Sequence, residues 1–168
     1  MADSAHLIHT ARLRALQSYL DARRLDALVV STPMNIAYLS GFVGSAGLLL
    51  ITREGLFLLV DGRYEVAARE SLGAGKLGPV TVERVDSRYD QALASVIARE
   101  GLQYVGLEAG NVTVATLSAW RRAVAGVEWR DRGDDGSLAE RRSSAVLPQY
   151  RSAHHGGDIH RGGQFICG

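Results

Sequence analysis

The chain has 168 residues, which suffice for one ordinary globular domain with a hydrophobic core and are too few for two large ones. Its composition is 46% hydrophobic and 22% charged, which excludes general disorder, and its formal net charge of +1 argues against nucleic acid and anionic lipid as partners. Because Cys167 is the one cysteine, no intrachain disulfide forms, and we expect a reducing, cytoplasmic setting. No apolar run has the length of a signal peptide or a membrane span, so we expect no membrane partner.

The first half of the chain alternates helical and strand patterns. Leu13, Leu16 and Leu20 recur at three- and four-residue spacing, which indicates an amphipathic helix. Two later apolar runs are separated by three residues ending in Gly55, which predicts a hairpin with a glycine available for a positive φ. In chain order we predict a helix over 10–24, a strand over 26–30, a short helix over 34–39 and an antiparallel pair over 48–52 and 56–60.

The same alternation continues through the second half. Asp61 is placed to cap a helix, because its carboxylate can accept from the free amides of the first turn. Gly101 and Gly126 mark where two later helices stop. We predict helices over about 63–72, 89–101 and 114–125, and strands over 80–85, 104–107 and 127–129.

This order of elements predicts the fold class. Alternating helices and strands with one internal hairpin indicate an α/β domain, in which a mixed sheet of roughly six strands is flanked by helices. From Asp131 onward glycine, serine, arginine and histidine dominate, and the apolar periodicity is lost. We therefore expect a folded domain over 1–130 and an irregular tail over 131–168.

Two glycine and serine patterns resemble known sites without meeting their requirements. Gly41, Gly44 and Gly47 have the wrong spacing for a dinucleotide fingerprint, and a helix precedes them where that motif needs a strand. Close packing or a tight turn explains them better. Ser45 has Val43, not glycine, two residues before it, so it does not form a nucleophile elbow.

Two groups of titratable side chains are equally ambiguous. Asp61 and Glu65 lie one helical turn apart and could form an acid–base pair, but a helix cap and a solvated helix face explain them without catalysis. The tail carries three imidazoles and a carboxylate that suit zinc, from His154, His155, Asp158 and His160. We favour adventitious metal binding there, because the tail lacks supporting groups that would orient these ligands.

Aromatic and basic side chains flank the two glycine-bearing turns, namely Tyr38, Phe42, Arg63 and Tyr64. They could present an aromatic surface and a guanidinium to a ligand carboxylate or to a partner. Packing into the core explains the aromatic residues equally well. Both interpretations stay open at this point.

Three segments resemble the N-terminal domain of the creatinase, prolidase and aminopeptidase P family. They are the run Asn-Ile-Ala-Tyr-Leu-Ser-Gly-Phe-Val-Gly-Ser-Ala-Gly over 35–47 with the strand after it, Asp-Gly-Arg-Tyr over 61–64, and Val-Gly-Leu-Glu over 105–108. The resemblance covers about residues 10 to 130. It implies a ribonuclease H-like α/β fold, and the glycine and serine after Phe42 resemble the Xaa-Pro peptidase branch more than the creatine-hydrolysing one.

The resemblance also implies where the chemistry belongs. In this family a following pita-bread domain holds two metal ions such as Mn, Co or Zn, bound by aspartate, glutamate and histidine, and acts on peptides with proline second. We expect no part of that domain, no catalytic residue and no metal in this chain, and no hydrolysis by the chain alone. The abrupt change of pattern near 143–168 suggests a truncated or frame-shifted gene product, or an artificial end of the chain.

By the same resemblance, Phe42, Ser45, Arg63 and Tyr64 are the expected substrate-facing residues. The expected function is that of a non-catalytic domain of an Xaa-Pro dipeptidase or aminopeptidase, contributing to oligomerisation and substrate access. Its expected partners are further copies of itself or a catalytic domain. The alternative is a stand-alone protein-interaction module that has the same fold and no peptidase role.

Overall fold

The computed structural model of this protein describes residues 2–131, with side chains from residue 9 to residue 130. Of the tail expected over 131–168, only Asp131 is among the described residues. The histidine cluster of the tail lies outside them. The helices are α1 (Ala2–Arg23), α2 (Pro33–Ser40), α3 (Gly62–Gly73), α4 (Tyr89–Arg99) and α5 (Val114–Ala123). The strands are β1 (Ala27–Val30), β2 (Leu48–Thr52), β3 (Leu56–Asp61), β4 (Val80–Val85), β5 (Tyr104–Leu107) and β6 (Glu128–Asp131).

The strands form one mixed sheet in the order β4-β3-β2-β1-β5-β6, which confirms the predicted fold class. β3 pairs with β4, β1 with β5, and β5 with β6, all in parallel. Within the described residues β2 runs against both of its neighbours, β1 and β3. The other five strands therefore all end on one side, which we call the C-terminal end of the sheet. The opposite side is the N-terminal end.

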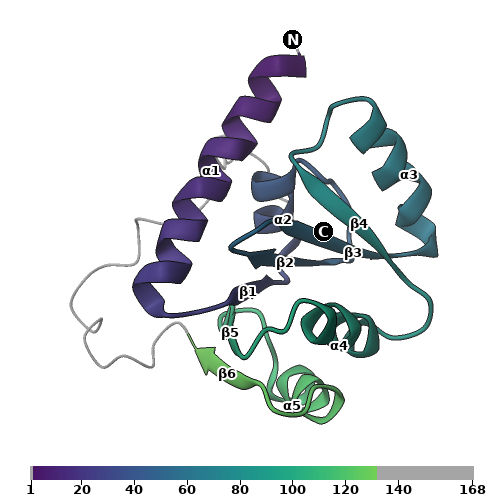
Figure 1. Cartoon of the computed structure of the whole chain (residues 1–168). Coiled ribbons are helices and arrows are strands. Elements are labelled where there is room, and N and C mark those ends of the chain that lie inside the picture. Colours follow the sequence, from purple (N-terminus) through teal and green to yellow (C-terminus); the bar gives the residue numbers. More distant parts are fainter. Residues whose placement is uncertain (1, 132–168) are drawn as a thin grey trace, which may run out of the picture.

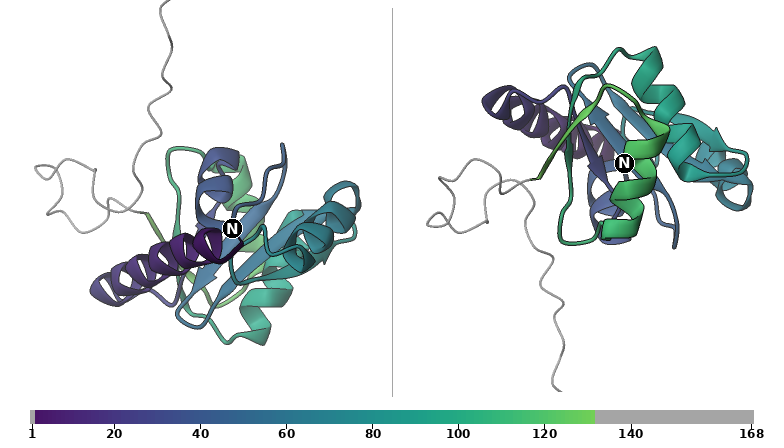
Figure 2. Two further views of the ribbon diagram at one scale, coloured as in Figure 1. Left: turned by 90° about the horizontal axis from the view of Figure 1, so that it is seen from above. Right: turned by 90° about the horizontal axis from the view of Figure 1, so that it is seen from below.

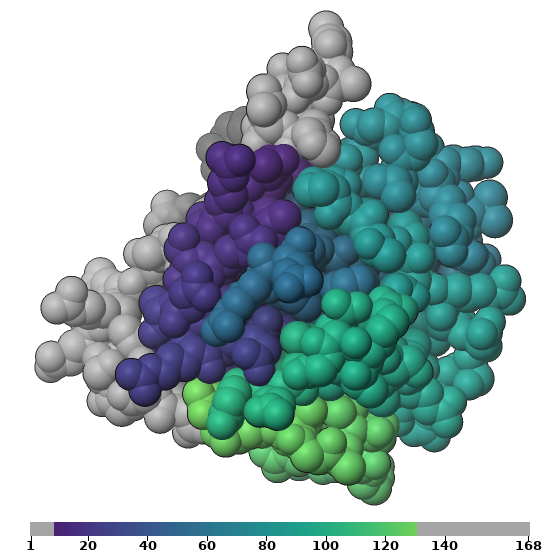
Figure 3. All heavy atoms as spheres, viewed as in Figure 1, coloured from purple at the N-terminus to yellow at the C-terminus, as the bar shows by residue number. Residues whose placement is uncertain are grey.

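Helices cover both faces of the sheet, α1, α2 and α3 on one face and α4 and α5 on the other (Figures 1 and 2). The alternation of side chains along each strand explains these layers, since successive residues point to opposite faces. In β1, Leu28 and Val30 pack with α1 and α2, whereas Ala27 and Val29 pack with α4 and α5. The space-filling view shows α1 in purple directly beside blue atoms of the α2 to β3 segment (Figure 3).

Helix α1 differs from its predicted span of 10–24 at both ends. It begins at Ala2, since no glycine or proline interrupts the first residues. It ends at Arg23 because Arg24 takes a positive φ of 52°. The amide of Leu25 then donates to the Leu20 carbonyl at 2.9 Å, which is the bond pattern of a Schellman ending. Sequence patterns miss this ending because that position is usually glycine.

The β2–β3 hairpin has its predicted place but a different turn. Gly55 is not among the described glycines with positive φ, so the expected role for it is wrong. The Thr52 hydroxyl instead accepts from the amides of Glu54 and Gly55, at 3.2 and 3.0 Å, and donates to the Gly55 carbonyl. A threonine side chain thus closes the turn that glycine was expected to close.

Three strands also differ from their predicted limits, among them β3, which runs one residue further than expected, to Asp61. β6 spans Glu128–Asp131 instead of 127–129, because its parallel pairing with β5 aligns Tyr104 with Glu128 and Leu107 with Asp131. Strand β6 therefore includes Asp131, which was expected in the tail. Asp26 was placed in the first strand, but β1 begins after it. None of the described helices is long and apolar enough to cross a membrane.

Candidate functional site

The four expected substrate-facing residues lie at the C-terminal end of the sheet, in two segments that come together there. Phe42 and Ser45 belong to the 41–47 loop between α2 and β2. Arg63 and Tyr64 belong to the first turn of α3, which follows β3. In sheets of this kind ligands usually bind beyond the carboxyl ends of the strands, so this end is the natural place for a site.

Phe42 holds the 41–47 loop against the core. Its side chain is buried, and its ring meets the ring of Tyr64 edge-on, with the centroids 6.0 Å apart and the planes at 87°. A Cβ atom on Gly44 would stand 2.6 Å from the Phe42 ring. Glycine at position 44 therefore allows close packing, as expected from the sequence, and Phe42 acts as an anchor below the exposed loop.

Ser45 and Tyr64 join the two segments at the surface. Their hydroxyl oxygens lie 2.6 Å apart, and the Ser45 amide donates to the Tyr64 hydroxyl at 3.4 Å. Hydrogen bonds from the Ser45 side chain and backbone lower the pKa of Tyr64 below its ordinary value of 10.0, because they stabilise the phenolate. The loop and α3 therefore share one hydroxyl pair that is open to solvent.

Replacing Ser45 by alanine should raise the pKa of Tyr64. The side-chain hydrogen bond disappears while the weaker backbone one remains, so the phenolate loses its largest single source of stabilisation. The change is measured by the phenolate absorbance during alkaline titration, with Tyr64→Phe identifying the contribution of Tyr64. Ser18→Ala is the matched control, because Ser18 bonds to the Arg14 carbonyl on α1. An unchanged Tyr64 titration in Ser45→Ala would contradict the hydroxyl pair.

Asp61 caps α3, as the sequence predicts, and it also binds Arg63. Its Oδ1 accepts from the Arg63 amide at 3.0 Å, and its two oxygens accept from Nε and Nη2 of Arg63 at 3.1 and 2.8 Å. Tyr89 donates its hydroxyl to Oδ2 at 3.2 Å. The Arg63 side-chain hydrogen bonds are the main reason that the pKa of Asp61 falls from 3.8 to about 2. Nε and Nη2 of Arg63 are thus engaged by Asp61, and the same guanidinium lies 5.5 Å from the centre of the Tyr64 ring.

The Asp61 cap predicts a pH-dependent stability difference between the wild type and Asp61→Asn. Since the pKa is lowered on folding, the ionised carboxylate stabilises the folded chain at any pH above about 4. That contribution is lost as the pH falls toward 2. The melting temperature of the wild type should therefore exceed that of the variant at neutral pH, and the gap should close in acid. Circular dichroism melts across this range test it, and a constant gap would contradict it.

The remaining sequence candidates have structural roles in the described part. Glu65 pairs with Arg69 at 3.0 Å and with Arg84 at 3.2 Å, so it belongs to a surface ion-pair network and not to a catalytic pair with Asp61. Gly41 ends α2 with a φ of 82°. The glycine run therefore shapes a loop between a helix and a strand, in agreement with the packing interpretation.

Sequence reasoning missed the residues that hold α2 at its N-terminal end. Glu108, which follows β5, accepts from the amides of Ser31 and Thr32 at 3.1 and 2.9 Å, and from the side-chain amide of Asn35. The Thr32 side chain makes no cap bond, and this carboxylate bonds the amides just before the helix and places a negative charge near the positive end of the helix dipole. Asn35 and Glu108 both lie in the segments that carry the family resemblance. Their presence there was the signal in the sequence that could have pointed to this contact.

The C-terminal end of α2 is also fully bonded. Its last five carbonyls accept, in order from Ile36 to Ser40, from the Ser40 hydroxyl, the Gly41 amide, Arg12, His9 and the Gly78 amide. The guanidinium of Arg12 also lies 3.7 Å from the centre of the Tyr38 ring, so Tyr38 packs against α1 and does not face a ligand. Because both ends of α2 are held, the 41–47 loop begins from a fixed point.

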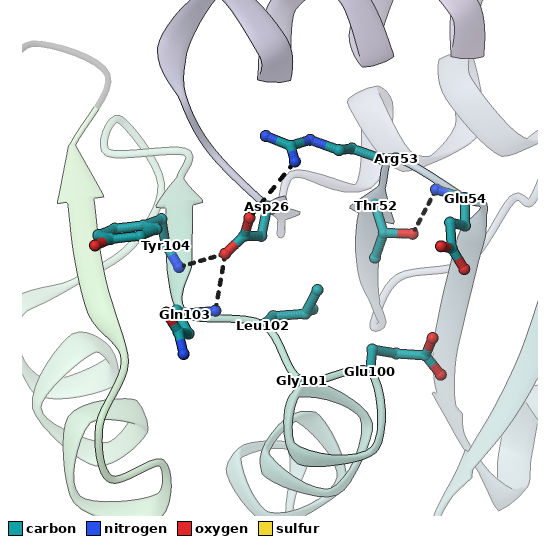
Figure 4. A pocket seen from close by; sticks show the side chains of 9 residues that line it. All are labelled: Asp26, Thr52, Arg53, Glu54, Glu100, Gly101, Leu102, Gln103 and Tyr104. Atoms are coloured by element: carbon teal, nitrogen blue, oxygen red, sulfur yellow. Dashed lines mark hydrogen bonds and ion pairs between the residues drawn. The ribbon is translucent and has the colours of Figure 1, made fainter.

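A polar pocket of about 350 Å³ opens at the opposite, N-terminal end of the sheet (Figure 4). Oδ2 of Asp26 accepts from the amides of Gln103 and Tyr104, at 2.9 Å each, and so ties the start of β1 to the start of β5. Nη1 of Arg53 lies 3.9 Å from Oδ1 of Asp26, and Nε of Arg53 lies 3.1 Å from Oδ1 of Asp21. The polar groups of this pocket mainly join chain segments to one another.

Metal ligation is not supported by the described side chains. Within residues 9 to 130 no three histidine, cysteine, aspartate or glutamate side chains come together in a way that could hold an ion. The carboxylates of the candidate site are engaged by arginine and by main-chain amides. The site can therefore present hydroxyls and a guanidinium, which are groups for binding, above the buried ring of Phe42.

A comparison with models of known protein families assigns the domain to one of them. The family model described as the creatinase/prolidase N-terminal domain matches residues 12–134. The chain belongs to this family. The match includes α2, the 41–47 loop, Asp61 with α3, and Glu108. The expected resemblance, drawn from three segments, is thereby confirmed.

Curated relatives of this creatinase/prolidase N-terminal domain are described as peptidases. The uncharacterized peptidase YqhT of Bacillus subtilis is 23% identical over 117 residues, which are 70% of this chain and 32% of the relative. A putative Xaa-Pro aminopeptidase of Mycoplasma pneumoniae is 33% identical over 61 residues, which are 36% of this chain and 17% of the relative. The matches thus span about a third or less of the curated relatives.

Solved structures show the same fold. The N-terminal domain of the cytoplasmic peptidase PepQ from Mycobacterium tuberculosis H37Rv is 31% identical, with a TM-score of 0.63 over 72% of this chain and 92% of that one. The Xaa-Pro dipeptidase from Bacillus anthracis is 20% identical, with a TM-score of 0.66 over 73% of this chain and 33% of that one. The creatinase-type domain therefore occurs both as an isolated N-terminal domain structure and within a longer peptidase chain.

Proposed function

We propose that this chain is a non-catalytic N-terminal domain of an Xaa-Pro dipeptidase- or aminopeptidase-like metallopeptidase, which works beside a catalytic domain. The family match over residues 12–134 carries the proposal, because several of the similar proteins are described as Xaa-Pro peptidases. The stand-alone interaction module has less support, since the relatives belong to longer peptidase chains. Peptides with proline second are the substrate class that this proposal implies.

The role of the domain in this proposal is to shape access to a neighbouring catalytic pocket. Ser45, Arg63 and Tyr64 offer polar groups at the C-terminal end of the sheet, and Phe42 fixes the loop that carries Ser45. A fixed loop suits this task, because a positioned binding group loses less conformational entropy than a mobile one. These groups can hold a peptide backbone or its carboxylate without reacting with it.

The proposal assigns the metal chemistry to the catalytic domain. Mn, Co or Zn would be bound there, as the similarity to Xaa-Pro peptidases implies. Association with further copies and a cytoplasmic setting complete the proposal. A cytoplasmic peptidase among the similar structures supports the second of these.

Hydrolysis assays test the proposed function. The purified full chain, with added Mn, Co or Zn, should not cleave an Xaa-Pro dipeptide. In a hybrid of the Bacillus anthracis dipeptidase, this whole chain replaces the matched third of that protein. The hybrid should cleave the Xaa-Pro dipeptide, and a chelator should abolish that cleavage. Cleavage by the chain alone, or a folded hybrid that cleaves other dipeptides but not Xaa-Pro, would contradict the proposal. A hybrid with a mutated metal ligand controls for contaminating peptidases.

A further inference from the structure

Large apolar side chains that stay exposed gather at one end of the molecule. Among the described residues they include Val43 and Val114, each 85% exposed, Val66 at 63% and Met34 at 50%. A single exposed valine needs no explanation, because much of any protein surface is apolar. Four such residues at one end of the molecule are a stronger signal, because a group of exposed apolar side chains often marks a contact surface.

Topology places all four at the C-terminal end of the sheet. Met34 is the second residue of α2, which follows β1, and Val43 lies in the loop that enters β2. Val66 is the fifth residue of α3, which follows β3, and Val114 opens α5, which comes after β5. Four separate chain segments thus each bring one apolar side chain to the end where the 41–47 loop lies. We call these four residues the apolar rim.

The apolar rim does not serve the core of this domain. Its chain neighbours do that: Ile36 in α2, Phe42 in the loop and Ala68 in α3 are all buried. The rim residues point outward from the same elements. Burying a valine or methionine stabilises a complex appreciably, so an exposed set of this kind favours an apolar partner.

The N-terminal end of the sheet exposes fewer large apolar side chains among the described residues. Its exposed large apolar residue is Tyr104, at 38%, and the guanidinium of Arg130 lies 4.4 Å from the centre of that ring. Charged groups dominate the pocket nearby, among them Asp26, Arg53 and Glu54 (Figure 4). The two ends of the domain therefore differ in their exposed large apolar residues, although the C-terminal end also carries polar groups such as Arg63.

We propose that the apolar rim is the surface on which a peptidase catalytic domain docks. This inference rests on the proposed function and adds the contact surface and its residues. The occupant follows from chain length, since the matched part is 33% of the Bacillus anthracis dipeptidase and 32% of the Bacillus subtilis relative. The other two thirds of such a protein must meet this domain. A formal net charge of +1 gives the chain no strong long-range attraction to a partner, so this inference relies on apolar contact.

Hydrogen exchange locates the docked surface. The full chain is compared alone and in the Bacillus anthracis hybrid, with mass spectrometry of peptides over 33–47, 62–66 and 111–116. Amides in these segments should exchange about tenfold more slowly in the hybrid, because docking suppresses local opening. Val43→Glu combined with Val114→Glu should remove that protection. The same changes should leave the melting temperature of the chain alone unaltered, since both side chains are exposed.

The controls separate this inference from the proposed function. Ala98→Glu, at an exposed position of α4, should leave the protection intact. Equal exchange in the chain and the hybrid, or protection that survives the double variant, would overturn the docking surface. Protection in the chain alone that rises with concentration would assign the rim to a second copy and also overturn it. A protected hybrid without Xaa-Pro hydrolysis would overturn the proposed function and leave the docking surface standing.

Discussion

Gly41→Ala should lower the free energy of unfolding by about 3 kcal/mol. Gly41 has a φ of 82°, where an L-residue with a side chain is strained, and its amide closes α2 by donating to the Ala37 carbonyl at 2.9 Å. An added Cβ would stand 2.8 Å from the backbone oxygen of Lys76 and 3.1 Å from Nε2 of His9. A backbone oxygen cannot move aside as a flexible side chain can, so strain and clash add.

Urea unfolding of the purified chain measures this loss. Gly55→Ala is the matched control, because Gly55 lacks a positive φ and no atom lies within 4 Å of its added Cβ. We expect that control to change the stability by less than about 1 kcal/mol. Equal stability of the two variants would show that the end of α2 tolerates a side chain. It would also remove the argument that the 41–47 loop begins from a fixed point.

Glu108→Ala should lower the free energy of unfolding by about 2 kcal/mol. The carboxylate is the described acceptor for the amides of Ser31 and Thr32 and for the side chain of Asn35. Removing it leaves partly buried donors without a partner, and it takes a negative charge away from the N-terminal end of α2. Glu108→Gln should cost less, since one amide oxygen can still accept from the two main-chain amides.

The matched control for Glu108 is Glu54→Ala, at an exposed glutamate in the hairpin turn. Thermal and urea unfolding should show a change within about 0.5 kcal/mol for Glu54→Ala and the full loss for Glu108→Ala. Asn35→Ala should give a smaller loss than Glu108→Ala, because it removes one of the three bonds. If Glu108→Ala behaves like Glu54→Ala, the carboxylate does not hold α2.

These two predictions concern opposite ends of the same short helix. Glu108 connects the start of α2 to the end of β5, and Gly41 connects its last turn to the segment before β4. Helix α2 has eight residues, too few to be stable without such support. The 41–47 loop, with Phe42 and Ser45, continues from this helix. Stability at both ends of α2 therefore sets the position of the candidate site.

The candidate site was predicted in part from the sequence. The hydroxyl pair of Ser45 and Tyr64 joins two predicted substrate-facing residues that are 19 positions apart. Asp61 was expected as a cap, and it is one. The bond between Asn35 and Glu108 spans 73 positions, and no local pattern predicts which distant carboxylate will meet a helix end. The substrate-facing role of the four residues stays a prediction.

The sequence by itself determined the fold class, the order of elements and most strand limits, because apolar periodicity and helix caps are local properties. The bounds of β2, β4 and β5 equal those expected from their apolar runs. Tertiary structure decided what depends on distant neighbours. It set the limits of β6 through pairing with β5, gave Arg24 a left-handed conformation and closed the hairpin with Thr52. It also brought the apolar rim to one end, because strand direction in the folded sheet decides which loops meet.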